Sequence, residues 1–217
     1  MPRFLVGATA DTWDFDAAYD AAKDGDIIEF TPNLTMNFTK EPFTEITKNI
    51  TIIGHVEGNT FLNTITGKIR VSNKAKVTFQ NLWMTVLENS NMFRITGESE
   101  VTFENCVLQS EFPANEHFLL FSEEKSKVNF KQLTTKLPDK HQLGMKFVQS
   151  AVSIQDSTIQ NRLWIRENSE LTFVRSKMEC SRPTSLWIED SKLSILSSQV
   201  SGTFEGGTQA VLNASKS

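Results

Sequence analysis

The chain has little cysteine, little tyrosine and no long apolar run. Its 217 residues include two cysteines and one tyrosine beside 16 phenylalanines. No stretch of about 18 apolar residues is present, so the sequence predicts no membrane insertion. The formal net charge of -4 disfavours nucleic acid as a partner, because nucleic acids are bound by basic surfaces. With 39% hydrophobic and 22% charged residues, the composition is that of a folded chain.

Motifs built on cysteine or glycine are missing as well. The sequence contains no Cys-x-x-Cys pair and no glycine-rich phosphate loop, so it predicts neither a metal site nor another cofactor. Cys106 and Cys180 would lie about 14 Å apart along the axis of the repeat described below. A disulfide allows at most about 7 Å between Cα atoms, so we predict two free thiols. Free thiols, and a start without the apolar core of a signal peptide, favour a cytoplasmic over a secreted location.

A short alternating pattern recurs six times along the chain. It reads Lys-Val-Thr-Phe-Gln-Asn at 76–81, and its second residue falls at positions 77, 101, 128, 152, 171 and 193. Alternation with period two predicts strands with one side facing a core. The predicted inward residues are Val77 and Phe79, Val101 and Phe103, Val128 and Phe130, Val152 and Ile154, Leu171 and Phe173, and Leu193 and Ile195.

Two further columns accompany this strand. A second short strand lies about eight residues before each repeat. A third column of inward residues comes directly after the repeats, at Leu82, Cys106, Leu133, Ser157, Ser176 and Ser198. Units of 19 to 27 residues without a helix predict an all-β solenoid, in which each coil adds one strand to each of several parallel sheets. A leucine-rich repeat is disfavoured because its Leu-x-x-Leu-x-Leu spacing is missing.

The N-terminal region resembles the capping helix and first strand of pectin-lyase-like proteins. The resemblance rests on residues 14–30 and on the strand at 49–54. It implies a right-handed, single-stranded parallel β-helix with a short N-terminal capping helix. Residues 1–26 are then the N-terminal strand and cap, and residues 27–217 are the coils.

The capping segment also has the pattern of a helix when considered alone. Phe15, Ala18, Tyr19 and Ala22 fall on one helical face, and aspartates precede it where a helix N-terminus favours negative charge. We expect Gly25 to end the helix. Such a helix would close the open end of the coil stack, whose strand edges would otherwise pair with other chains.

The C-terminal segment aligns with an earlier strand. Residues 209–217 match residues 185–193 at an offset of 24. This alignment predicts that the chain stops inside a coil and that a longer parent protein continues beyond residue 217. The alternative is a natural frayed end.

The distribution of acidic residues differs from that expected of a catalytic member of the family. The resemblance implies that a lyase would carry clustered acidic residues that hold calcium, and that a hydrolase would carry paired aspartates. Here six of the nine aspartates fall within the first 26 residues, and the others are spread over three coils. We therefore expect no catalysis. The alternative is a lyase or glycoside hydrolase acting on acidic polysaccharide through Glu104, Glu111 and Glu116, with His117 close by.

The preceding strand of each coil supplies a candidate binding face. Its middle residues are predicted to point outward in a line, about 5 Å apart: Arg70, Arg94, Leu120, Lys146, Trp164 and Trp187. Aromatic and arginine side chains anchor interfaces and also bind sugars and carboxylates. The sequence thus predicts a non-catalytic binding or scaffold module for a protein or polysaccharide surface.

Three other accounts of this face stay open at this stage. Residues 134–144 or 202–208 of the same chain could cover the tryptophans, or downstream sequence could do so. The chain could also be a segment of a homotrimeric phage or surface spike, which makes a homo-oligomer one possible state.

Overall fold

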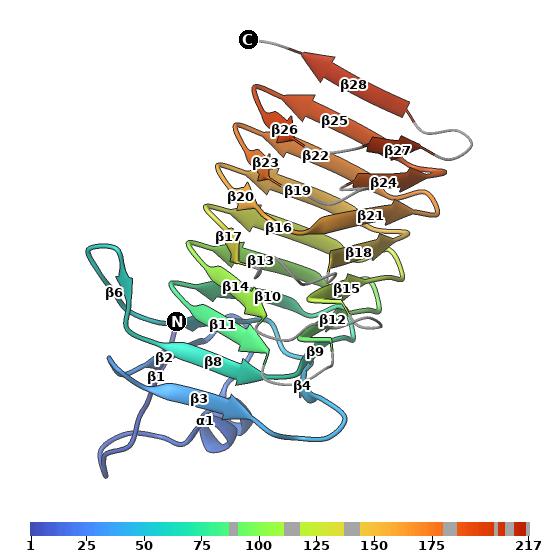
Figure 1. Ribbon diagram of the computed structural model, residues 1–217. Coiled ribbons are helices and arrows are strands. Elements are labelled where there is room, and N and C mark those ends of the chain that lie inside the picture. Colours follow the sequence, from blue (N-terminus) through green and yellow to red (C-terminus); the bar gives the residue numbers. More distant parts are fainter. Residues whose placement is uncertain are drawn as a thin grey trace.

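The chain forms a right-handed parallel β-helix: the repeat predicted a solenoid of parallel sheets, and the resemblance implied its hand. The computed structural model describes residues 1–86, 91–110, 118–136, 144–179, 186–201, 204–206 and 211–215. It is a parallel β-solenoid of about seven turns, with 57% strand and one short helix in the part described. The coils form a stack with α1 at its N-terminal end and β28 at the other end (Figure 1).

Three parallel sheets form the walls of the solenoid. Sheet A contains β1 (Arg3–Val6), β2 (Ile27–Phe30), β5 (Ile50–Ile53), β10 (Lys76–Gln80), β13 (Glu100–Glu104), β16 (Lys127–Lys131), β19 (Ala151–Gln155), β22 (Glu170–Val174), β25 (Lys192–Leu196) and β28 (Val211–Ser215). Sheet B contains β3 (Thr35–Phe38), β8 (Thr64–Gly67), β11 (Trp83–Val86), β14 (Val107–Ser110), β17 (Thr134–Lys136), β20 (Thr158–Ile159), β23 (Lys177–Glu179) and β26 (Gln199–Ser201).

Sheet C forms the third wall and carries the predicted binding residues. It contains β4 (Thr44–Ile46), β9 (Ile69–Val71), β12 (Phe93–Ile95), β15 (Leu120–Ser122), β18 (Gly144–Val148), β21 (Arg162–Arg166), β24 (Leu186–Glu189) and β27 (Phe204–Gly206). A small antiparallel hairpin, β6 (Val56–Glu57) with β7 (Thr60–Phe61), projects from the stack near its N-terminal end (Figure 1).

The register of sheet A confirms the predicted repeat residue by residue. Val77 pairs with Val101 and Phe79 pairs with Phe103, and the same alignment continues through the following coils. The inward residues of β10 through β22 are buried, whereas the threonine between each pair in β10 and β13 is only partly so. The period-two pattern therefore correctly identified which side of each strand faces the core.

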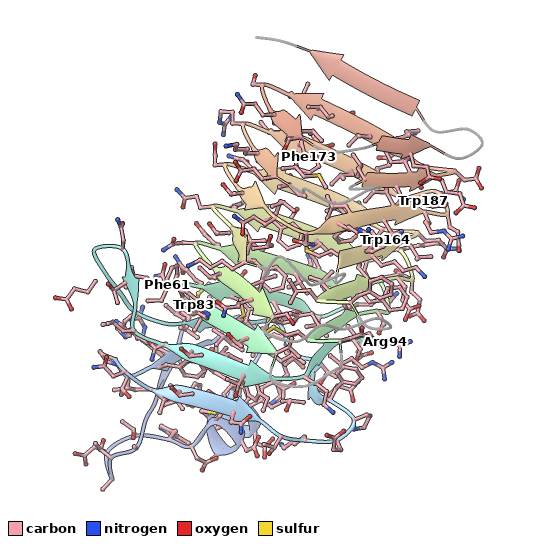
Figure 2. The ribbon with its side chains drawn as sticks, in the orientation of Figure 1. Phe61, Trp83, Arg94, Trp164, Phe173 and Trp187 are labelled. Carbon is pink, nitrogen blue, oxygen red and sulfur yellow. The ribbon has the colours of Figure 1, made fainter. Side chains whose placement is uncertain are left out.

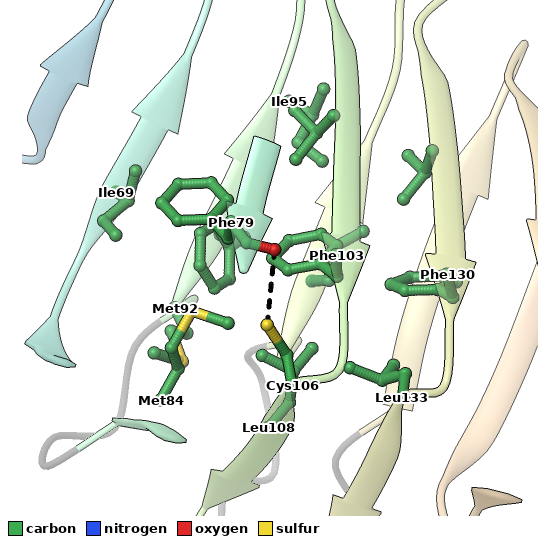
Figure 3. Close-up of a cluster of buried hydrophobic side chains, with 14 of the residues drawn as sticks. Ile69, Phe79, Met84, Met92, Ile95, Phe103, Cys106, Leu108, Phe130 and Leu133 are labelled. Atoms are coloured by element: carbon green, nitrogen blue, oxygen red, sulfur yellow. Dashed lines mark hydrogen bonds between the residues drawn. The ribbon is translucent and has the colours of Figure 1, made fainter. Parts of the chain in front are cut away.

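Stacked phenylalanine rings fill the middle of the core (Figure 3). The ring of Phe103 lies parallel to Phe79 at 5.5 Å and to Phe130 at 5.4 Å between centroids. Phe93 from sheet C meets Phe103 edge-on at 4.9 Å. A solenoid offers the same slot in every coil, and flat rings at the coil spacing stack with one another. This repeated slot accounts for the excess of phenylalanine over tyrosine.

The third inward column changes from apolar residues to serines partway along the stack. The backbone N–H of Leu133 donates to Ser157 Oγ at 3.0 Å, and that of Ser157 donates to Ser176 Oγ at 3.1 Å. The backbone N–H of Ser176 donates in turn to Ser198 Oγ at 3.0 Å. Each hydroxyl thus satisfies a backbone donor of the coil before it, which explains how polar residues occupy an inward column.

A short helix, α1 (Phe15–Ala21), covers the N-terminal end of the core. Asp14 caps it, with a side-chain oxygen that accepts a backbone N–H of the first turn at 2.9 Å. The expectation that Gly25 ends the helix is wrong, because the helix ends at Ala21 and Gly25 lies in the turn beyond it. The ammonium group of Lys48 instead donates to three carbonyls around the helix C-terminus at 2.6–3.0 Å.

The alignment of the C-terminal segment at an offset of 24 is also wrong. β28 pairs with β25, so Val211 lies beside Lys192 at an offset of 19. The coil from Ala151 to Glu170 has the same length of 19 residues. Because β27 already occupies the next place on sheet C, beside β24, the last strand takes its place on sheet A.

Cys106 is a buried free thiol, as predicted, and Cys180 lies outside the described residues. The Sγ atom of Cys106 lies 3.4 Å from the backbone carbonyl oxygen of Phe79, as the dashed line in Figure 3 shows. Burial raises the pKa of this thiol from 9.0 to about 12. Removing the thiolate from water is costly, so the folded chain keeps Cys106 protonated where the unfolded chain does not.

This pKa difference predicts a loss of stability at alkaline pH. The contribution of Cys106 is fully present below pH 9, and it is lost as the pH rises towards 12 because the unfolded thiol ionises first. Between pH 8 and pH 10.5 the wild type should lose about 2 kcal/mol more than Cys106→Ala does. Urea unfolding of both proteins at the two pH values measures the difference. Parallel losses in both proteins would contradict the assigned burial.

Candidate binding face on sheet C

The predicted binding residues lie in one outward row on sheet C. Strand register places Arg70, Arg94, Lys146, Trp164 and Trp187 in that row, on strands of sheet C whose neighbours lie about 4.8 Å apart. Figure 2 shows Arg94, Trp164 and Trp187 on the same side of the stack. The complete row, called the sheet C row below, reads Glu45, Arg70, Arg94, Phe121, Lys146, Trp164, Trp187 and Glu205.

One member of the predicted row is corrected by the register. Leu120 was expected to point outward, but it is buried, and Phe121 takes the outward place beside Arg94 and Lys146. The run Leu119-Leu120-Phe121 is apolar throughout, so alternation alone does not fix its phase. The strand register fixes the phase, because it places Phe121 beside Arg94 on one side and beside Lys146 on the other.

Ion pairs between neighbouring strands accompany the row. The guanidinium group of Arg94 lies 2.8 Å from the carboxylate of Glu123, and that of Arg166 lies 2.6 Å from Glu189. Both pairs are partly shielded from solvent. The exposed fraction of the side chain is 39% for Arg94 and 21% for Glu123. It is 36% for Arg166 and 33% for Glu189. The face therefore carries paired charges of both signs rather than a strip of unpaired cations.

An aromatic and cationic cluster occupies the middle of the row. The ammonium nitrogen of Lys146 lies 5.6 Å from the ring centre of Phe118 and 5.3 Å from that of Phe121. Phe118 also meets the indole of Trp164 edge-on at 5.4 Å. Within the described residues, Lys146 has no carboxylate partner, so these rings are its only close contacts of opposite polarity.

The indole of Trp164 is held in place by a glycine. A Cβ added to Gly144 would lie 1.9 Å from the six-membered ring of Trp164, so only glycine leaves room for the indole. Both Trp164 and Trp187 are partly buried rather than bare. The indole Nε1 of Trp187 is buried and has no acceptor within the part of the chain described. Gly144 thus supports the idea that the chain covers part of Trp164, while residues 137–143 lie outside the described set.

Of the candidate catalytic residues, the structure describes only Glu104. Glu104 lies at the end of β13, while Glu111, Glu116 and His117 fall outside the described residues. The Asp156 carboxylate is held by Arg175 through hydrogen bonds of 2.7 and 2.8 Å, which lower the pKa of Asp156. Among the described residues, no group of three histidine, cysteine or acidic side chains is placed to hold a metal ion.

Several contributors to this face were not found from the sequence. Phe118, Glu123, Arg166 and Glu189 all contact or neighbour the sheet C row. Arg166 and Glu189 each lie two residues after the predicted outward position of their strand, so a search of flanking positions would have found them, whereas Glu123 lies three residues after Leu120. Phe118 precedes its strand, and nothing in the repeat marks it.

Comparisons with known protein families, curated proteins and solved structures found no match. In the part of the chain that the structure describes, no helix has the length and apolar character needed to cross a membrane. The chain is thus assigned to the class of parallel β-solenoids by its fold alone.

Proposed function

We propose that this chain is a non-catalytic, pectin-lyase-like scaffold that binds another protein through the sheet C row. The proposal rests on the aromatic side chains of Phe121, Trp164 and Trp187 in the row. The ion pairs Arg94–Glu123 and Arg166–Glu189 flank them. Protein interfaces combine buried aromatic and arginine anchors with a polar, charged surround. The rigid solenoid supports these side chains on strands rather than on loops.

The charge balance favours a protein over an acidic polysaccharide. Arg70 lies 4.0 Å from Glu45, and Arg94 and Arg166 have carboxylate partners as well. An acidic polymer would have to displace these carboxylates from the arginines. A protein partner with charges of both signs can complement them as they stand, which gives specificity and orientation.

Exchanging the members of two ion pairs tests this proposal without removing either ion pair. In Arg94→Glu/Glu123→Arg and Arg166→Glu/Glu189→Arg the internal pairs persist, but the charge pattern offered to a partner is reversed. Partners are first captured from cells that produce the protein, and the binary complex is then reconstituted. We expect each exchange to weaken binding about tenfold, because like charges then face one another across the interface.

A matched control exists at another corner of the solenoid. Asp156 and Arg175 form the same kind of ion pair away from the row, so Asp156→Arg/Arg175→Asp should leave affinity unchanged. Equal affinity in all the exchanged variants would contradict the proposal. So would a captured glycan that binds while no protein does, because the row would then serve sugar recognition.

A further inference from the structure

Each of the three sheets ends in an edge strand at the N-terminal end of the stack. These strands are β1 on sheet A, β3 on sheet B and β4 on sheet C, and Figure 1 shows them at that end. An edge strand carries backbone N–H and C=O groups on its free side, and these groups can pair with another chain. The three edges differ in how far the chain itself covers them.

Two of these edges are covered by contacts within the chain. On sheet A, the backbone carbonyl of Leu5 accepts the N–H of Trp13 at 2.9 Å, and the N–H of Gly7 donates to the carbonyl of Trp13 at 3.1 Å. On sheet C, the backbone N–H of Thr47, directly after β4, donates to the hydroxyl of Tyr19 at 2.8 Å. Since β4 has only three residues, little of its edge is left for a partner.

The edge of β3 has no such cover. The N–H of Thr64 in β8 donates to the carbonyl of Leu34 at 3.3 Å, and Thr64 is the register partner of Thr35. In a parallel ladder, alternate residues of a strand bond to its neighbour, so Met36 bonds to β8 while the backbone groups of Thr35 and Asn37 face the free side. Both residues are exposed, and within the described part of the chain their backbone groups have no partner on that side.

Open space lies between this edge and the start of α1. It has a volume of about 290 Å³ and is lined by residues 36–40 on one side and 14–16 on the other. The helix therefore leaves room beside the strand for an extended backbone. The rings of Phe15 and Phe38 lie 4.7 Å apart between centroids and close the inner end of the space. A ligand here lies along the strand edge and not within the core.

The charge at this end of the chain favours one kind of occupant. The first 60 residues contain ten acidic and four basic side chains, although the net charge of the whole chain is only -4. Asp14 lines the space and has no cationic partner among the described residues, whereas Asp16 pairs with Lys40 at 2.7 Å. Two copies of the chain paired at their β3 edges would bring like charges together. A basic segment of another protein complements them.

We propose that the free edge of β3 binds an extended basic segment of a partner protein as an additional strand of sheet B. The segment pairs with the backbone groups of Thr35 and Asn37, and one of its lysine or arginine side chains lies near Asp14. Backbone hydrogen bonds supply affinity in this mode of recognition, and side-chain contacts supply the preference for sequence. The edge is separate from the sheet C row, and the function proposed for that row does not depend on it.

An acetylated and amidated hexapeptide of alternating lysine and valine is the probe, titrated into the full chain by calorimetry and amide NMR. We expect saturable binding with a dissociation constant below about 1 mM. Hydrogen exchange should slow at the amides of Thr35 and Asn37, which gain a partner, and should change little at Met36. The analogue with glutamate in place of lysine should bind about tenfold more weakly or worse. A fully N-methylated lysine peptide has no backbone donors and should show no saturable binding.

Two substitutions at one position separate the strand edge from the side chain. Thr35→Pro removes an N–H that faces the free side, and proline is tolerated at the first residue of an edge strand. It should weaken the lysine peptide about tenfold, whereas Thr35→Ala should bind it as the wild type does. Asp14→Asn keeps a good helix cap and should weaken the lysine peptide about threefold.

The N-methylated peptide tests the same hydrogen bonds on the wild type if Thr35→Pro does not fold. No saturable binding of the lysine peptide, or equal binding of its N-methylated form, would overturn the proposal. Slowed exchange at other amides in place of Thr35 and Asn37 would overturn it too. So would a wild-type dimer in light scattering that Thr35→Pro converts to a monomer, because a second copy would then occupy the edge.

Discussion

Replacing Phe103 with alanine is expected to destabilise the chain by about 3–5 kcal/mol. Phe103 is fully buried, and its ring contacts Phe79, Phe93 and Phe130 at 4.9–5.5 Å between centroids. The substitution removes the apolar surface of the ring and leaves a cavity in the middle of the stack. Each coil is stabilised only by its neighbours, so the coils on both sides should lose protection together.

Urea unfolding measures this loss, and hydrogen exchange locates it. Thr78→Ala is the matched control, because Thr78 lies between two core residues but points outward, and it should change stability by less than about 0.5 kcal/mol. Phe103→Leu should fall between the two variants. A loss below about 1 kcal/mol for the alanine variant, with protection retained in neighbouring coils, would contradict a continuous stacked core.

Much of the fold could be predicted because the solenoid repeats one environment. Residues equivalent to Val77 and Phe79 recur in later coils, and aligning them predicts the strand register that sheet A has. The cap could be predicted for a different reason, since Asp14 and the apolar face of α1 form a local pattern. The strand register follows from a pattern that recurs along the chain, and the helix follows from a pattern within one short segment.

Contacts that depend on coil length could not be predicted. Lys48 caps α1 from 26 to 29 residues away, and Arg94 meets Glu123 at a separation of 29. Such pairs form only when the turns between the strands have fixed lengths and the side chains have fixed rotamers. The same uncertainty displaced Phe121 by one position and gave the wrong offset for β28. The free edge of β3 is recognisable only once the order of the strands in sheet B is known.

Removing both tryptophans of the sheet C row is expected to weaken partner binding by about 100-fold or more. A central tryptophan at an interface typically contributes about 2 kcal/mol or more when truncated to alanine, although two neighbouring effects do not simply add. Trp164 and Trp187 occupy adjacent strands of the row and are partly exposed. The fold should persist in Trp164→Ala/Trp187→Ala, because the inward residues of β21 and β24 are unchanged.

Trp83→Ala provides a control for loss of packing. Trp83 is also partly buried, but it lies on sheet B, beside Phe61 (Figure 2). Its ring centroid lies 6.1 Å from that of Phe61 and 4.2 Å from Nζ of Lys136. Its removal should cost stability of a similar order while leaving the sheet C row intact. Thermal unfolding of both variants separates effects on the fold from effects on binding.

The dissociation constant of the reconstituted complex, measured by calorimetry for the wild type and these two variants, tests the binding role of the sheet C row most directly. The account predicts an increase of about 100-fold or more for Trp164→Ala/Trp187→Ala and no change for Trp83→Ala. Wild-type affinity in the double variant, or an equal loss in both variants, would contradict it, since the row would then not be the surface that the partner contacts.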